Sequence, residues 1–405
     1  MRAGDGCATV IRMAPASSSG RTHVLIAGGG FAAVEAMLAL HALAAEHVRM
    51  TLISASPLLA YKPAATLESF DETPPLAYDL QAIATDVGAS FRVDRVEAVA
   101  AGAHRARFAS FTHLDYDALV LAVGARATVG IAGALTFRDQ QQVRHIRRLV
   151  SELSSGTLRR IVFAVPGGCS WPLPVYELAL LTATRLGELD VPGEVMLVSP
   201  EVTPLCVFGA QTSRLVAQLL DERGVRFIGE AEPQSVDRSG ALVLESGERL
   251  DADRVVAAPR LRGPRISGLP ADRWGFVTTG ALGDVVGFPD VYAAGDMTSF
   301  PIKQGGLAAQ QADVIAQRIA SSHGLSVAES RVHRILRARL VGGANPVYLR
   351  TELDEFGQAT ASTLHGHFND PQDADTPPEK VFGRYLSPYL HSRRPALSPT
   401  PAAAG

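Results

Sequence analysis

Residues 24–36 have the sequence VLIAGGGFAAVEA, in which an apolar run ends in three glycines and a second apolar segment follows. This order is typical of a strand, a tight turn and a helix. Gly28, Gly30 and Ala33 fit the pattern G-x-G-x-x-A. The first glycine permits the turn, the second lets a pyrophosphate approach the backbone, and the small third residue lets helix and strand pack closely. The stretch therefore predicts a dinucleotide site at a helix N-terminus.

The strand expected next, residues 48–54, ends in Ser54, where dinucleotide-binding proteins usually carry an acidic residue that binds the ribose. A serine hydroxyl can also bind a ribose. Two interpretations stay open: Ser54 contacts the ribose, or it only ends a strand.

A second strand–turn–helix–strand unit is predicted over residues 160–200. Its turn contains Gly167 and Gly168 but lacks G-x-G-x-x-G, and the acidic residue after its second strand is displaced to Glu201. We therefore expect a second domain that keeps the dinucleotide-binding fold without tight NAD(P)H binding, while NAD(P)H as a substrate stays an alternative.

Gly295 and Asp296 follow a third predicted strand and precede a helix expected to begin near Gly305. A carboxylate here can accept hydrogen bonds from a ribityl chain. Positive potential at the edge of a flavin ring stabilises its reduced form. The groups expected to supply it are Lys303 and the free amides of Gly306 and Leu307.

Three segments, VLIAGGGFAAVEA, YDALVLAVGA (116–125) and VYAAGDMTSFPIKQGGLAAQQA (291–312), resemble the FAD-binding motifs of the pyridine nucleotide-disulfide oxidoreductases. Within that family the chain is similar to the branch of sulfide:quinone reductases, flavocytochrome c sulfide dehydrogenases and type II NADH dehydrogenases, over about residues 22–325. The resemblance implies non-covalent FAD. It also implies an α/β fold of two Rossmann-like dinucleotide-binding domains, one inserted in the other, with a small C-terminal α+β region.

The resemblance further assigns each part of FAD to residues of this chain. The pyrophosphate would contact Gly28, Gly30, Phe31 and Ala32, and the adenine would contact the backbone of Val96. Ala122 and Gly124 would lie on the near side of the cofactor, and Asp296 would bind the ribityl chain. Lys62 and Pro63 would approach the isoalloxazine.

We expect five regions along the chain. They are a disordered N-terminus (1–20), the FAD-binding domain (21–128 and 277–325), the second domain (129–276), the C-terminal region (326–390) and a disordered tail (391–405).

The cysteines exclude one chemistry of the family and leave another open. No cysteine lies between Cys7 and Cys169, so the C-x4-C pair of the disulfide reductases is absent. Cys169 stands where sulfide:quinone reductases place a flavin-facing cysteine, at a strand end where a thiolate would be stabilised. Sulfide:quinone reductases also need a second cysteine in their C-terminal part, and no cysteine follows Cys206 in this chain. We favour Cys169 as an inert apolar residue, with redox catalysis as the alternative.

The composition limits the kinds of binding partner and the location that we expect for the protein. A net charge of −3 over 405 residues argues against nucleic acid, and the three cysteines favour a reducing, cytoplasmic setting. No transmembrane segment is expected, although the apolar, aromatic residues 381–390 leave a peripheral membrane or quinone contact open. The scattered histidines predict no metal site. A homodimer stays open.

The sequence therefore predicts an FAD-dependent oxidoreductase that passes a hydride or an electron pair between a small-molecule donor and acceptor, neither of them identified. The alternatives are a sulfide:quinone reductase-like enzyme that uses Cys169 and a non-catalytic FAD-binding protein.

Overall fold

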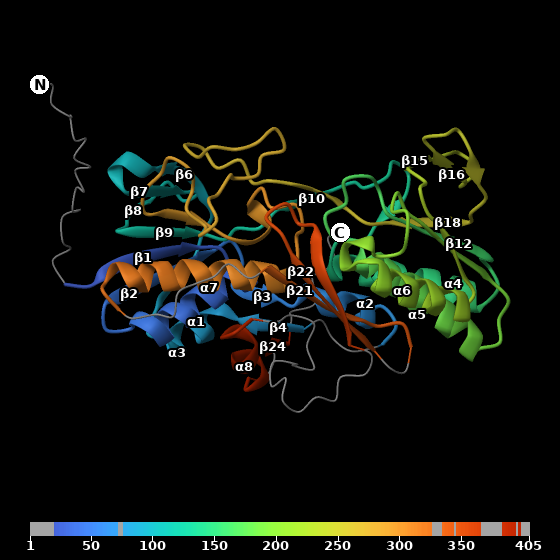
Figure 1. Cartoon of the computed structure of the whole chain (residues 1–405), viewed down its shortest axis with the longest axis horizontal. Coiled ribbons are helices and arrows are strands. Elements are labelled where there is room, and N and C mark those ends of the chain that lie inside the picture. The colour runs from blue at the N-terminus through green and yellow to red at the C-terminus, as the bar shows by residue number, and fades with distance from the viewer. Residues whose placement is uncertain are drawn as a thin grey trace, which may run out of the picture.

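The computed structural model describes residues 20–71, 76–325, 334–343, 346–365, 383–393 and 396–397. Two parallel five-stranded sheets lie side by side along the longest axis of the molecule, each with helices on one face and a small antiparallel sheet on the other (Figure 1).

The first sheet has the strand order β20-β9-β1-β2-β5, with all strands parallel. The bounds of its strands are β1 (Thr22–Ala27), β2 (Val48–Ser54), β5 (Ser90–Val93), β9 (Ala118–Leu121) and β20 (Val291–Ala293). Helices α1 (Phe31–Ala44), α3 (Leu80–Asp86) and α7 (Gly305–Ser322) contribute to the core on one face. The antiparallel strands β6 (Val96–Ala100), β7 (Arg105–Phe108) and β8 (His113–Asp115) form a smaller sheet. Its buried side chains pack with those of the first sheet and form a separate core on the other face.

The second sheet has the order β11-β18-β12-β13-β14, again all parallel. Its strands are β11 (Leu135–Thr136), β12 (Arg160–Ala164), β13 (Glu194–Val198), β14 (Val225–Ile228) and β18 (Arg254–Ala257). Helices α4 (Val143–Ser154), α5 (Leu173–Glu188) and α6 (Ala210–Glu222) pack on one face. Strands β15 (Pro233–Val236), β16 (Leu242–Leu244) and β17 (Arg249–Leu250) cover the other.

Between the two large sheets, the antiparallel pair β10 (Arg126–Thr128) and β19 (Arg260–Arg262) marks where the chain leaves the first sheet and where it returns. The chain then completes the first sheet with β20. The predicted α/β fold, with one Rossmann-like domain inserted in the other, is confirmed. The residue boundaries given above for the domains stay a prediction.

The C-terminal region adds an antiparallel sheet of β21 (Arg334–Leu340), β22 (Val347–Leu353) and β23 (Ala359–His365), which confirms the small α+β region. The short helix α8 (Leu386–His391) lies against α1, where the buried Glu35 carboxylate accepts hydrogen bonds from the amides of Tyr385 (3.0 Å) and Leu386 (2.6 Å).

Two residues of the predicted disordered tail, Ala396 and Leu397, form strand β24 beside β4 (Leu76–Asp79), which also pairs with β3 (Leu58–Ala60). These two residues pair with the free edge of β4, and α8 ends at His391, so parts of the predicted tail have regular structure, while its residue bounds stay a prediction. Residues 1–19, which make up nearly all of the predicted disordered N-terminus, lie outside the described residues.

Candidate functional site

The glycine turn after β1 is packed tightly on two sides and open on the third. A Cβ on Gly28, whose φ is +142°, would lie 2.1 Å from the carbonyl oxygen of Ala122, and a Cβ on Gly29 would lie 2.1 Å from Ser54 Oγ. A Cβ on Gly30 would meet no heavy atom within 4 Å. Gly30 is also the N-cap of α1, and no side chain caps this helix. The amides of the first turn thus face open space, which suits an anion.

Asp296 lies on the same edge of the sheet, in the 3₁₀ turn Gly295–Met297 that follows β20. The turn is close to α7 and α1, because a Cβ on Gly295 would lie 3.3 Å from Ala308 of α7 and 3.5 Å from Ala32 of α1. Burial raises the pKa of Asp296, while Lys303 and Lys62 oppose the rise. No hydrogen bond to its carboxylate occurs among the described residues, so this group is available to the hydroxyls of a ligand.

Lys303 is 7% exposed and its ammonium donates a hydrogen bond to the carbonyl of Thr298. The same ammonium lies 4.1 Å from the ring centre of Phe276. Burial lowers the pKa of Lys303 to about 8, against the opposing effect of Asp296 and Asp272. Lys303 therefore brings a titratable positive charge next to Asp296.

The N-terminus of α7 differs from the sequence prediction. Gln304 is its N-cap, and the Gln304 side chain accepts a hydrogen bond of 2.9 Å from the amide of Leu307. The expectation that the Leu307 amide is free is wrong, because this cap satisfies it. Gly306 is buried at the same helix start.

Beside the glycine turn that follows β1, Ser54 is buried and its Oγ accepts a 3.2 Å hydrogen bond from the amide of Ser56. The amide of Asp94 donates to the carbonyl of Ser54 over 2.9 Å, which holds the start of β6, and hence Val96, beside the turn. Ser54 Oγ therefore borders Gly29, at the position expected for a ribose contact.

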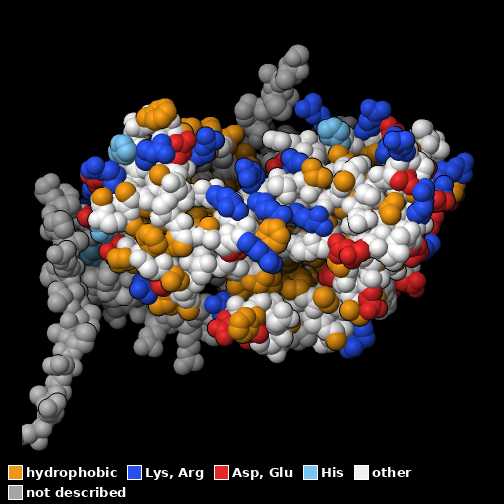
Figure 2. All heavy atoms as spheres, turned by 90° about the horizontal axis from the view of Figure 1, so that it is seen from above, with side chains coloured by type: hydrophobic (Ala, Val, Ile, Leu, Met, Phe, Trp, Pro, Cys, Tyr) orange, Lys and Arg blue, Asp and Glu red, His pale blue; other side chains and the backbone are white. Residues whose placement is uncertain are grey.

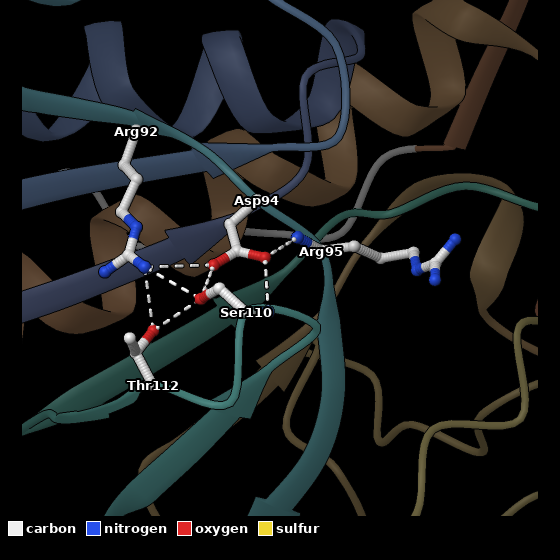
Figure 3. Close-up of polar contacts among 5 residues, drawn as sticks. All are labelled: Arg92, Asp94, Arg95, Ser110 and Thr112. Carbon is white, nitrogen blue, oxygen red and sulfur yellow. Dashed lines mark hydrogen bonds and ion pairs between the residues drawn. The ribbon is translucent and has the colours of Figure 1, made fainter.

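Asp94 does not replace the missing acidic residue. Figure 3 shows its carboxylate surrounded by Ser110, Arg92 and the amide of Arg95, with the Arg95 side chain extending away. Desolvation opposes ionisation, but the Ser110 hydroxyl and the other donors hold the pKa of Asp94 below its ordinary value. Both oxygens are thus committed to fastening the β5–β6 connection.

The remaining predicted contacts surround the same turn. Lys62 is exposed and Pro63 half-buried in the 3₁₀ turn Lys62–Ala64, and the preceding Tyr61 packs edge-on against Phe31 at 5.6 Å. The amide of Ala122 donates to Ala27 over 2.7 Å, and a Cβ on Gly124, whose φ is +71°, would meet no heavy atom within 4 Å. The structure thus brings the residues predicted to bind the cofactor to one edge of the first sheet.

Cys169 packs against the core of the second domain, together with Trp171. Burial raises the pKa of its thiol to about 11, although the Trp171 amide opposes the rise. The apolar surroundings therefore disfavour the thiolate expected at this strand end, and the role of Cys169 stays a prediction. Cys206 is exposed and its thiol donates to Glu201 over 3.8 Å.

Sequence reasoning missed three residues that shape these turns. Gln304 could have been found from its place directly before the predicted helix. Asp94 and Glu232, whose carboxylate accepts a hydrogen bond from the Gly167 amide, carry no local signal, because each contacts a turn distant in sequence.

Within the described part of the chain, no three His, Cys, Asp or Glu side chains gather in a way that could hold a metal ion. In the same residues, no helix combines the length and apolar character that crossing a membrane requires.

Comparison with known proteins places the chain in a family. Residues 22–315 match the family model described as pyridine nucleotide-disulphide oxidoreductase. The ferredoxin–NAD(+) reductase component of a biphenyl dioxygenase system from Paraburkholderia xenovorans (strain LB400) is 29% identical over 49% of this chain, and the match spans only 48% of that relative. The ferredoxin reductase component of a chlorobenzene dioxygenase from Cupriavidus sp. (strain PS12) is 28% identical over 82% of this chain and 84% of its own.

Solved structures share the fold. The sulfide:quinone oxidoreductase of Aquifex aeolicus superposes with a TM-score of 0.75 at 17% identity, over 85% of this chain and 87% of that one. The ferredoxin reductase for the CYP199A2 system of Rhodopseudomonas palustris gives 0.65 at 18% identity, over 82% of each chain. The family match covers most of the chain, and the protein belongs to the pyridine nucleotide-disulphide oxidoreductases, as an oxidoreductase of that family.

Proposed function

We propose that the chain binds FAD non-covalently at the glycine turn of its first domain and passes an electron pair through it. The observation that carries the proposal is the open space at Gly30, in front of the uncapped start of α1 and on the same sheet edge as Asp296, whose carboxylate accepts no hydrogen bond from the residues that the structure describes. The turn suits a pyrophosphate, and the carboxylate suits a polyol. The family binds FAD and NAD(P)H, which supports the choice of cofactor.

In this proposal the cofactor supplies the reversible electron-pair chemistry, and the chain orients it and sets its potential. The amides after Gly28 and Gly30, including those of Phe31 and Ala32, hold the pyrophosphate. Ser54 and Val96 bound the adenosine end, and Asp296 holds the ribityl hydroxyls. The groups assigned to the flavin ring and its near side are Lys62, Pro63, Ala122, Gly124, Gly295, Lys303 and Gly306.

The flavin content of the purified protein tests the proposal. We expect about one FAD per chain, released intact when the protein is denatured. A colourless protein that FAD cannot reconstitute would contradict it.

For the electron acceptor we propose an acidic electron-carrier protein of the ferredoxin class rather than the small molecule or quinone expected from the sequence. Two relatives are named as ferredoxin reductase components. Figure 2 shows Lys and Arg side chains gathered across the middle of the face above β10. Near β10, Arg262 of β19 pairs with Arg126, and Trp274, which is 42% exposed, lies between Arg262 (4.3 Å) and Arg273 (4.9 Å).

We define this positively charged surface by Arg126, Arg262, Arg265, Arg273 and Trp274, which are joined by the Arg126–Arg262 strand pair, the two arginine–Trp274 contacts and a hydrogen bond from Arg265 to the Arg273 carbonyl. Among the described residues, none of its four arginines has a carboxylate within ion-pair distance. Two residues beyond Trp274, the ring of Phe276 contacts the Lys303 ammonium. A partner on this surface would therefore sit close to the proposed flavin, and arginines that have no carboxylate partner among the described residues favour an acidic one.

Reversing two of these charges tests the surface. We expect Arg262→Glu combined with Arg273→Glu to lower kcat/KM for an acidic ferredoxin by about tenfold or more, mainly through KM, because like charges repel at the encounter. Reduction of ferricyanide should change little. Arg214→Glu, an exposed site on α6, is the matched control. Equal ferredoxin kinetics in the double variant and the control would show that the carrier docks elsewhere.

The sulfide:quinone reductase-like alternative is not favoured, because burial raises the pKa of the Cys169 thiol and, in the part of the chain that the structure describes, no second cysteine lies at this turn. We expect Cys169→Ser to retain most of the turnover with any electron donor that reduces the wild-type flavin. Stopped-flow flavin reduction with sulfide and with NADH, offered singly, measures this. Loss of turnover with every donor while FAD stays bound would make Cys169 the redox centre.

A further inference from the structure

The two domains carry equivalent turns that can be aligned by their hydrogen bonds. In each domain, the amide of the first residue after the middle strand (β1 or β12) donates to a carbonyl near the end of the neighbouring strand β2 or β13. The amide of the first residue after the strand on the other side (β9 or β18) donates to the last carbonyl of the middle strand. These pairs are Gly28 to Ile53 (2.7 Å) and Ala122 to Ala27 (2.7 Å) in the first domain, and Val165 to Val198 (2.8 Å) and Ala258 to Ala164 (3.0 Å) in the second. Counted from these pairs, Gly167 takes the position of Gly30.

The two equivalent glycines have opposite surroundings. A Cβ on Gly30 would meet nothing within 4 Å, whereas one on Gly167 would lie 2.3 Å and 2.5 Å from the two carboxylate oxygens of Glu232. The amide of Gly167 donates to Glu232 Oε1 over 2.8 Å. The position that is open to an anion in the first domain is thus occupied by the chain's own carboxylate in the second.

Arg260 fixes this arrangement from the other side. Its Nε donates to the carbonyl of Gly167 over 3.1 Å, and its Nη2 lies 3.7 Å from Glu232 Oε1. Glu232 follows β14 and precedes β15, and Arg260 begins β19, so two distant segments hold the turn. In addition, α5 begins only at Leu173, whereas α1 begins directly after Gly30.

We propose that Glu232 is a specificity-determining residue that excludes the pyrophosphate of NAD(P)H from the second domain. A dinucleotide must expel a carboxylate of its own charge sign and break the Gly167 and Arg260 contacts. The electron pair then enters from a donor without a pyrophosphate. The inference rests on the proposed function, since it names the class of donor that the flavin does not use.

The test is isothermal titration of the FAD-saturated protein with NAD⁺, which carries the same pyrophosphate and cannot reduce a flavin. We expect Glu232→Ala to raise NAD⁺ affinity by about tenfold or more over the wild type, because both the charge and the bulk are removed. Glu232→Gln removes only the charge and should give a smaller gain. Glu230→Gln, an exposed neighbour, is the matched control and should give none.

Unchanged NAD⁺ affinity in both Glu232 variants, or wild-type affinity equal to that of Glu232→Ala, would overturn the proposal. If the alanine variant does not fold, the glutamine variant decides alone. FAD content is measured first on every sample. Failure to bind FAD refutes the proposed function, whereas bound FAD with unaltered NAD⁺ affinity refutes only the role of Glu232.

Discussion

Gly30→Glu should give a folded protein that contains no flavin. The added carboxylate would stand in the open space in front of α1, where it repels a pyrophosphate and offers the free amides an internal anion instead. Glu232 already shows such an arrangement at Gly167. Because a Cβ at Gly30 meets no neighbour within 4 Å, the fold itself should tolerate the change. Absorbance of the purified variant, with circular dichroism for folding, measures both effects.

Gly102→Glu provides the matched control, because Gly102 is exposed and a Cβ there also meets nothing within 4 Å. It adds the same charge away from the turn and should keep full flavin content. A yellow Gly30→Glu protein with stoichiometric FAD would place the cofactor elsewhere and remove the basis of the proposed function.

Lys303→Met should lower the midpoint potential of the bound flavin by tens of millivolts. A partly buried charge contact is worth roughly 1–2 kcal/mol, and a two-electron couple converts about 1.4 kcal/mol into 30 mV. Removing the ammonium disfavours the more negative, reduced form. FAD content should hold, since the proposed pyrophosphate contacts lie on α1.

The pH dependence sharpens this prediction. Burial brings the pKa of Lys303 down to about 8, so its charge is present below that pH and lost above it. The difference in potential between wild type and Lys303→Met should therefore shrink as the pH rises through 8, while Lys303→Arg keeps its charge throughout. Redox titrations at several pH values decide it: identical potentials at low pH would mean that Lys303 does not act on the flavin.

The first domain was predictable because its signals are local. The apolar run before Gly28, the small residues of α1 and the glycine pair at the start of α7 lie within short windows of sequence.

What escaped prediction depends on tertiary contacts. Core residues from several elements raise the pKa of the Cys169 thiol, which agrees with the favoured interpretation of an inert residue, whereas its strand-end position alone had left a stabilised thiolate open. Glu232 reaches Gly167 across 65 residues of sequence. No period or motif links Glu232 to Gly167. The sequence therefore showed that the second domain lacks G-x-G-x-x-G, but it could not show that the Glu232 carboxylate occupies this turn.

The burial of Glu35 between α1 and α8 couples folding to proton uptake. Burial raises the pKa of Glu35 to about 7 from 4.5, although the amides of Tyr385 and Leu386 oppose the rise. Between these values the native chain holds a proton that the unfolded chain has released, so stability falls as the pH rises through this window. Helix α1, which begins at the proposed cofactor site, thus carries a buried carboxyl group that makes the fold most stable in mildly acidic solution.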